Sequence, residues 1–66
     1  MNQVVIRYLG GKEYSYKTSG EIGVGFDAKL GWVSVYVDGD EISHDWDWVG
    51  AISTEGEVKL VDVYSP

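Results

Sequence analysis

An all-β domain is the fold class that this 66-residue chain predicts, and three observations indicate it. Nine glycines divide the chain into short segments. The segments between them are rich in Val, Ile, Tyr and Trp, the residue types that favour strands. No stretch repeats apolar residues at helical spacing, so we expect no helix longer than one turn. A chain this short forms one domain, residues 1–66, with a small core.

The composition excludes several classes of protein. The chain has eleven acidic residues, five basic residues and no cysteine, for a formal net charge of −6. Without cysteine it has no disulfide, no thiolate metal site and no thiol nucleophile. The hydrophobic fraction of 44% argues against disorder, yet no apolar run is long enough to span a membrane. No signal sequence follows Met1, so we expect a soluble, unprocessed, cytoplasmic protein that needs no cofactor and no membrane.

The first hairpin is expected from residues 3–9 and 12–18, which flank a Gly-Gly dipeptide. Two glycines reach the positive φ angles of a type I′ turn at low steric cost. Pairing outward from a two-residue turn places Arg7 opposite Tyr14. A cation–π contact between these side chains is worth about 0.5 to 1 kcal/mol at an exposed site.

Three glycines follow within residues 19–25, at Gly20, Gly23 and Gly25. Their spacing is not that of a G-x-G-x-x-G dinucleotide-binding turn, and no βαβ pattern follows. We therefore interpret the segment as a bulged or sharply bent strand rather than a phosphate-binding loop.

The second hairpin is expected from residues 32–37 and 42–49, around residues 38–41 with their Asp-Gly turn signal. Side chains alternate between the two faces of a strand. The face predicted to form core carries Val33, Val35, Val37, Ile42, His44, Trp46 and Trp48. The face predicted to lie at the surface carries Trp32, Ser34, Tyr36, Glu41, Ser43, Asp45 and Asp47.

Gly50 is expected to break or bend the strand that begins at residue 42, and its continuation, residues 51–54, is expected to pair with the last strand, residues 57–64, across a Glu-Gly turn. The result is a five-stranded antiparallel meander. Such a sheet either curls into a small, partly open barrel of the SH3 type or forms a single twisted sheet that buries one face against a partner. We favour the barrel.

Part of the chain resembles SH3 domains. Residues 45–51, Asp-Trp-Asp-Trp-Val-Gly-Ala, and residues 55–58, Glu-Gly-Glu-Val, are similar to the tryptophan strand and following hairpin of that family. The resemblance implies the barrel fold. The chain departs from the family where Asp47 separates the two tryptophans, and it lacks the proline and aromatic pair that closes the family's peptide groove. No functional residue is carried over.

Acidic residues are concentrated in the second half of the chain. Three acids accompany four bases up to Val37, whereas eight acids accompany a single base after it. The densest group is Asp38, Asp40, Glu41, Asp45 and Asp47. Alternate residues on a strand lie roughly 6.7 Å apart, a spacing comparable with that of nucleic-acid phosphates. We interpret this group as a partner-binding surface for a basic, nucleic-acid-binding protein.

Two aromatic residues, Trp32 and Tyr36, share the predicted acidic face and offer apolar contact area to the same partner.

The group of acidic residues has two other interpretations. The first is that the charges keep the protein soluble and protect an edge strand from pairing with another chain. A binding site for a divalent metal is the third interpretation of the group, because Asp38 with Asp40 and Asp45 with Asp47 form Asp-x-Asp pairs. Neither pair has the remaining ligands of an EF-hand, so we expect no metal site.

Catalysis is not expected. Ser43, His44 and Asp45 contain the residue types of a catalytic triad, but neighbours on a strand point to opposite faces. His44, the one histidine, is interpreted as a structural core residue. Glu41 with Asp45 or Asp47 has the residue types of a glycosidase pair, yet so small a domain supplies no deep cleft. We therefore predict that the protein is not an enzyme.

In size, acidity and absence of catalytic motifs the chain is similar to phage-encoded inhibitors of bacterial defence, including anti-CRISPR proteins and other DNA mimics. The likeness implies a partner such as a CRISPR-Cas complex in the cytoplasm of a bacterial host. Direct nucleic-acid binding is disfavoured by the net charge of −6. The alternative is an SH3-like adaptor or structural module, such as a phage virion part or a homodimer, whose acids serve only solubility.

Overall fold

The computed structural model describes residues 1–61, and it confirms the all-β class. These residues form, in chain order, β1 (Asn2–Tyr8), β2 (Glu13–Thr18), β3 (Ile22–Asp27), β4 (Trp32–Val37), β5 (Asp40–Asp45), the 3-10 turn η1 (Trp46–Trp48), β6 (Val49–Glu55) and β7 (Lys59–Val61). In this part of the chain, no helix has the length and apolar character needed to cross a membrane.

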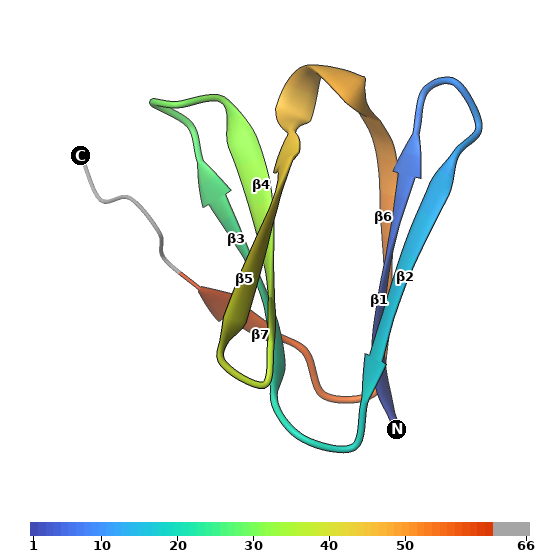
Figure 1. Ribbon diagram of the computed structural model, residues 1–66, viewed down its shortest axis with the longest axis vertical. Coiled ribbons are helices and arrows are strands. Elements are labelled where there is room, and N and C mark those ends of the chain that lie inside the picture. Colours follow the sequence, from blue (N-terminus) through green and yellow to red (C-terminus); the bar gives the residue numbers. More distant parts are fainter. Residues whose placement is uncertain (62–66) are drawn as a thin grey trace.

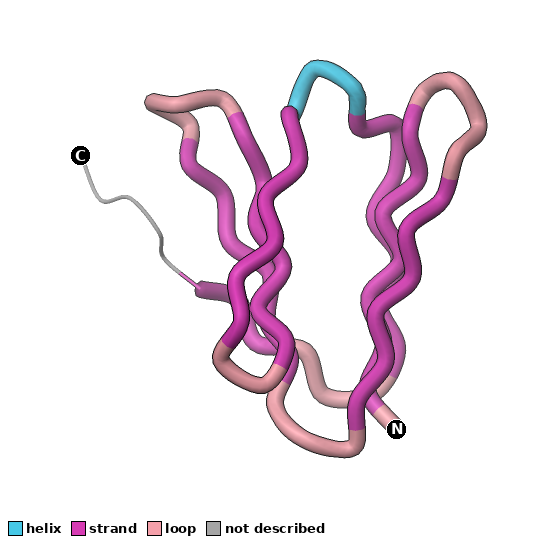
Figure 2. Tube along the Cα trace, viewed as in Figure 1, coloured by secondary structure: helices cyan, strands magenta, loops and turns pink. Residues whose placement is uncertain are grey.

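The strands form two sheets that face each other (Figure 1). One is three-stranded, in the order β2-β1-β6, and the other is four-stranded, in the order β5-β4-β3-β7. All pairings are antiparallel except that between β3 and β7, which is parallel. Figure 2 shows η1 crossing from one sheet to the other at the top of the molecule. Neither sheet closes into a barrel.

The expected five-stranded meander is not confirmed. The segment of residues 19–25 contributes a regular strand, β3, and β1 is flanked by β6 as well as by β2. Residues 59–61, expected to pair with β6, instead pair with β3. Gly56 allows this change of direction, because its φ of 79° lies in the left-handed region that favours glycine. Residues 62–64 of the last predicted strand lie outside the described residues.

The predicted register of the first hairpin is wrong by one residue. Hydrogen bonds from Gly11 N to Tyr8 O (2.9 Å) and from Tyr8 N to Lys12 O (2.7 Å) make the turn longer than Gly-Gly alone. Arg7 therefore lies opposite Glu13 rather than Tyr14, and its guanidinium forms an ion pair with that carboxylate at 2.6 Å. The expected cation–π contact of Arg7 with Tyr14 is replaced by one from Lys12, whose Nζ lies 5.2 Å from the ring centroid.

This shift changes the composition of the inner face. A one-residue slip moves every side chain of a strand to the other side of the sheet. Tyr14 now lies opposite Ile6, and Tyr16 lies opposite Val4. Both tyrosines are partly buried and contact the core.

The second hairpin has the predicted turn. Asp38 and Gly39 have φ angles of 49° and 91°, as a type I′ turn requires, and Val37 pairs with Asp40. The alternation is confirmed for Val33, Val35 and His44, which are buried.

The prediction is wrong for the two tryptophans assigned to the core. Trp46 and Trp48 are 47% and 61% exposed. Their strand ends at Asp45, because its Oδ1 accepts a hydrogen bond from Asp47 N at 3.0 Å and so begins η1. The alternation on which the prediction depended stops at that residue.

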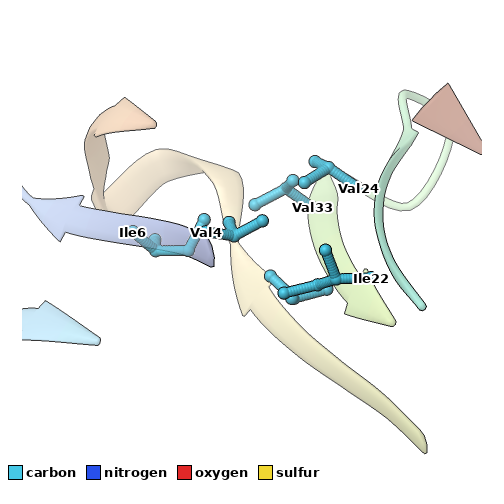
Figure 3. Packing of buried hydrophobic residues seen from close by; sticks show 6 residues of the cluster. Val4, Ile6, Ile22, Val24 and Val33 are labelled. Carbon is cyan, nitrogen blue, oxygen red and sulfur yellow. The ribbon is translucent and has the colours of Figure 1, made fainter. Parts of the chain in front are cut away.

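Within residues 1–61, six buried apolar side chains make up the core, and both sheets supply them (Figure 3). They are Val4, Ile6, Ile22, Val24, Val33 and Val35. A core this small leaves the fold dependent on the partly buried tyrosines around it.

Candidate protein-binding surface

The five acids of the predicted surface follow the edge of the four-stranded sheet. Asp38 lies in the β4–β5 turn, three lie on β5, and Asp47 lies in η1. β5 pairs with β4 only, so its other edge is unpaired within residues 1–61. From Asp40 to Asp45 the strand extends over about 17 Å. The acids therefore form an elongated band rather than a compact patch. We call Asp38, Asp40, Glu41, Asp45 and Asp47 the acidic edge.

Four predicted site residues share one face. Trp32 lies directly opposite Asp45, and Tyr36 lies directly opposite Glu41. Alternation places all four on the outer face, the side of the four-stranded sheet away from the three-stranded sheet, because His44 on the inner face contacts β1 and β2. The expected grouping of aromatic and acidic side chains is therefore present for these four. Asp47 was also predicted for this strand face but belongs to η1 instead.

A hydrogen-bond network fixes Glu41 on this face. Ser34 Oγ donates to Glu41 Oε2 at 3.0 Å and lies 3.0 Å from Ser43 Oγ. Ser34 was predicted to be exposed but is fully buried. Its hydroxyl is hydrogen-bonded, as burial requires. Burial, together with the Glu41 charge, raises the pKa of Tyr36.

Two members of the acidic edge also stabilise the fold. Asp38 Oδ2 accepts a hydrogen bond from the Thr18 hydroxyl at 2.7 Å, which ties the β4–β5 turn to the end of β2. Asp45 caps η1. The side chains of Asp40 and Asp47 are exposed and have neither of these roles. These two acids are therefore the best suited to mutation without loss of structure.

The ion pairs of residues 1–61 lie elsewhere. Arg7 pairs with Glu13 at 2.6 Å, and Lys59 pairs with Glu21 at 3.0 Å. Neither pair includes a member of the acidic edge. Both pairs are exposed, so each contributes little to stability. Two of the five basic residues thus pair with acids outside the edge.

Sequence reasoning missed the polar cluster on the inner face. The hydroxyl of Tyr8 lies 2.7 Å from His44 Nδ1, and the hydroxyl of Tyr16 lies 2.7 Å from His44 Nε2. Burial lowers the pKa of His44 and raises the pKa of both tyrosines. Both ring nitrogens are therefore engaged in linking the two sheets. The alternation of Tyr14 and Tyr16 with polar residues indicated that the two tyrosines share one face of the strand. Because the predicted register was wrong by one residue, that face was not recognised as the inner one.

No group of three or more His, Asp or Glu side chains within residues 1–61 is arranged to hold a metal ion. No protein-family model matches this chain, and neither a curated protein nor a solved structure is detectably similar to it. The function is therefore inferred from the arrangement of the chain's own residues.

Proposed function

We propose that this protein binds a basic, nucleic-acid-binding protein through the acidic edge and so blocks the groove that would hold nucleic acid. The observation that supports this most directly is the charge along β5. Five carboxylates follow one sheet edge, and neither ion pair of residues 1–61 involves them. Like charges so close repel one another, and a basic partner relieves that repulsion.

The mechanism is competition for positive charge. Carboxylates accept charge-assisted hydrogen bonds from Arg and Lys, as phosphates do. Over the roughly 17 Å of β5, Glu41 and Asp45 face the outer side of the sheet and Asp40 faces the other side, with Asp38 and Asp47 beyond the two ends of the strand. Trp32 and Tyr36 add apolar contact area on the outer face beside Glu41 and Asp45. The net charge of −6 opposes binding of nucleic acid itself.

A nucleic-acid-binding complex of bacterial defence, such as CRISPR-Cas, is the partner class we propose, with the bacterial cytoplasm as the location. Inhibition of this kind needs no catalytic group, cofactor or metal. Steric and electrostatic occupation of the groove suffices.

The alternative function is an SH3-like adaptor or structural module that assembles through apolar surface. Exposed apolar side chains support it. Leu60 is 87% exposed on β7, and Phe26 and Trp48 are also exposed. Assembly through such surface responds weakly to salt, whereas binding to a basic groove weakens as salt screens the charges.

The test is affinity capture from bacterial lysate at about 50 and 200 mM salt, a range over which contacts to charged grooves weaken strongly. Three forms are compared: wild type, the double variant Asp40→Lys with Asp47→Lys, and the control Glu55→Lys with Glu57→Lys. The control carries the same charge change away from the acidic edge. We expect wild type and control to capture a nucleic-acid-binding protein that added DNA displaces, and the edge variant to lose it. Equal capture by the edge variant, or capture insensitive to salt, would contradict the proposal.

A further inference from the structure

A small cavity lies where the β3–β4 loop meets η1. Its volume is about 270 Å³, and its lining residues are Phe26, Asp27, Ala28, Gly31, Trp32 and Trp46. Trp46 N donates a hydrogen bond to Gly31 O at 3.0 Å, which holds η1 against the loop. The cavity is roomy enough for the end of one side chain but smaller than the usual site for a drug-sized ligand.

Aromatic rings form three of its walls. The rings of Phe26 and Trp46 meet edge to face, with centroids 5.2 Å apart and an interplanar angle of 80°. Trp32, Phe26 and Trp46 each remain 39% to 47% exposed, so the rings are accessible from solvent. The face of an aromatic ring carries negative electrostatic potential and attracts a cation placed over it.

One carboxylate lines the same cavity, and two others are neighbours of its lining residues. Asp27 lines it and is itself 92% buried, with Oδ1 accepting hydrogen bonds from Lys29 N at 3.1 Å and Leu30 N at 3.0 Å. Asp45 lies opposite Trp32 in the strand pairing, and Asp47 follows Trp46 in η1. Among residues 1–61, no lysine or arginine lines the cavity. The occupant that fits a cavity lined by three aromatic side chains and a buried carboxylate is a cation with an apolar surface.

We propose that this cavity binds the guanidinium or alkylammonium group of a basic side chain. That the side chain belongs to a protein partner rests on the proposed function, because Asp45 and Asp47 of the acidic edge are neighbours of the lining residues Trp32 and Trp46. The preference for an organic cation rests on the lining residues alone. The cavity then receives one anchoring arginine or lysine while the edge pairs with other charges of the same partner.

The test is an NMR titration of the full chain with two cations, tetramethylammonium and ethylguanidinium, and with tert-butanol as a neutral compound of similar size. Ionic strength is held constant. The indole N–H signals of Trp32 and Trp46 report on the cavity, and that of Trp48, which does not line it, serves as the internal reference. We expect saturable shifts of the first two signals with each cation, and binding of tert-butanol at least about ten-fold weaker.

Two matched variants locate the site. Trp46→Leu should weaken cation binding by about ten-fold, whereas Trp48→Leu should leave it unchanged. Trp32→Leu provides a second test if Trp46→Leu does not give a folded spectrum. Equal affinity for tert-butanol, or no saturable shift, would overturn the site. Cation binding with partner capture unchanged in Trp46→Leu would overturn only the assignment of the ligand to a partner side chain.

Discussion

The hydrogen bonds of His44 should make the protein less stable as the pH falls below neutrality. A neutral imidazole has one donor nitrogen and one acceptor nitrogen. One tyrosine hydroxyl therefore donates to the ring and the other accepts from it. Burial lowers the pKa of His44 in the folded state. The unfolded chain then binds more protons than the folded chain between the lowered pKa and the ordinary value of about 6.5. Stability is fully present above about pH 6.5 and is lost as the pH falls toward the folded-state pKa.

The contribution of these hydrogen bonds to stability can be tested by removing one tyrosine hydroxyl. His44 is only 5% exposed, so the Tyr16→Phe variant leaves a buried ring nitrogen without its partner at 2.7 Å. An unsatisfied buried polar group costs about 1 to 3 kcal/mol, a large share of the stability of so small a domain. His44→Gln supplies the control for pH, because a carboxamide also donates and accepts but does not titrate.

The assay is urea unfolding monitored by tryptophan fluorescence at pH 5.5, 6.5 and 7.5. This window lies above the ordinary titration range of carboxylates. We expect the free energy of unfolding of wild type to fall from pH 7.5 to pH 5.5, and that of His44→Gln to stay nearly constant. Tyr16→Phe as stable as wild type at pH 7.5, or an equal pH dependence in His44→Gln, would refute the reasoning.

Two further predictions concern the core and the turns. Ile6→Ala removes a fully buried side chain and should lower the free energy of unfolding by about 2 to 5 kcal/mol, whereas Trp48→Ala, at a residue 61% exposed, should lower it by less than about 1 kcal/mol. Thermal melting followed by circular dichroism compares the two variants, and equal losses of stability would contradict the core assignment. Gly56→Ala should destabilise by more than about 1 kcal/mol, because φ is +79° and the added Cβ would lie 2.5 Å from Asn2 Oδ1. Gly10→Ala, where nothing lies within 4 Å, is its control, and unfolding in urea that does not separate the two variants would refute this account.

Much of the local structure was predictable because it depends on neighbouring residues. The Asp-Gly turn after β4 requires two positive φ angles, and Asp38 and Gly39 tolerate them. Alternation then assigned Val33, Val35 and His44 to the interior. The same local rules grouped Trp32 with Asp45 and Tyr36 with Glu41.

The errors arose where a single residue changed the pattern. A longer first turn moved Tyr14 and Tyr16 to the inner face, and Gly-Gly alone does not specify turn length. The Asp45 cap converted the expected continuation of β5 into η1 and so exposed Trp46 and Trp48. The order of the strands in the sheets could not be predicted from the sequence, for a different reason. Whether β1 takes β6 as a neighbour depends on long-range packing, which periodicity along the chain does not encode.

The position of β1 between β2 and β6 sets the order in which the molecule can assemble. Gln3 pairs with Glu55, so the three-stranded sheet stays incomplete until most of the chain has left the ribosome. Before that point the first two strands form only a hairpin, which is marginally stable alone. Closing so long a loop favours slow folding. Premature termination within β6 should therefore leave a product without a stable fold, rather than a shorter working domain.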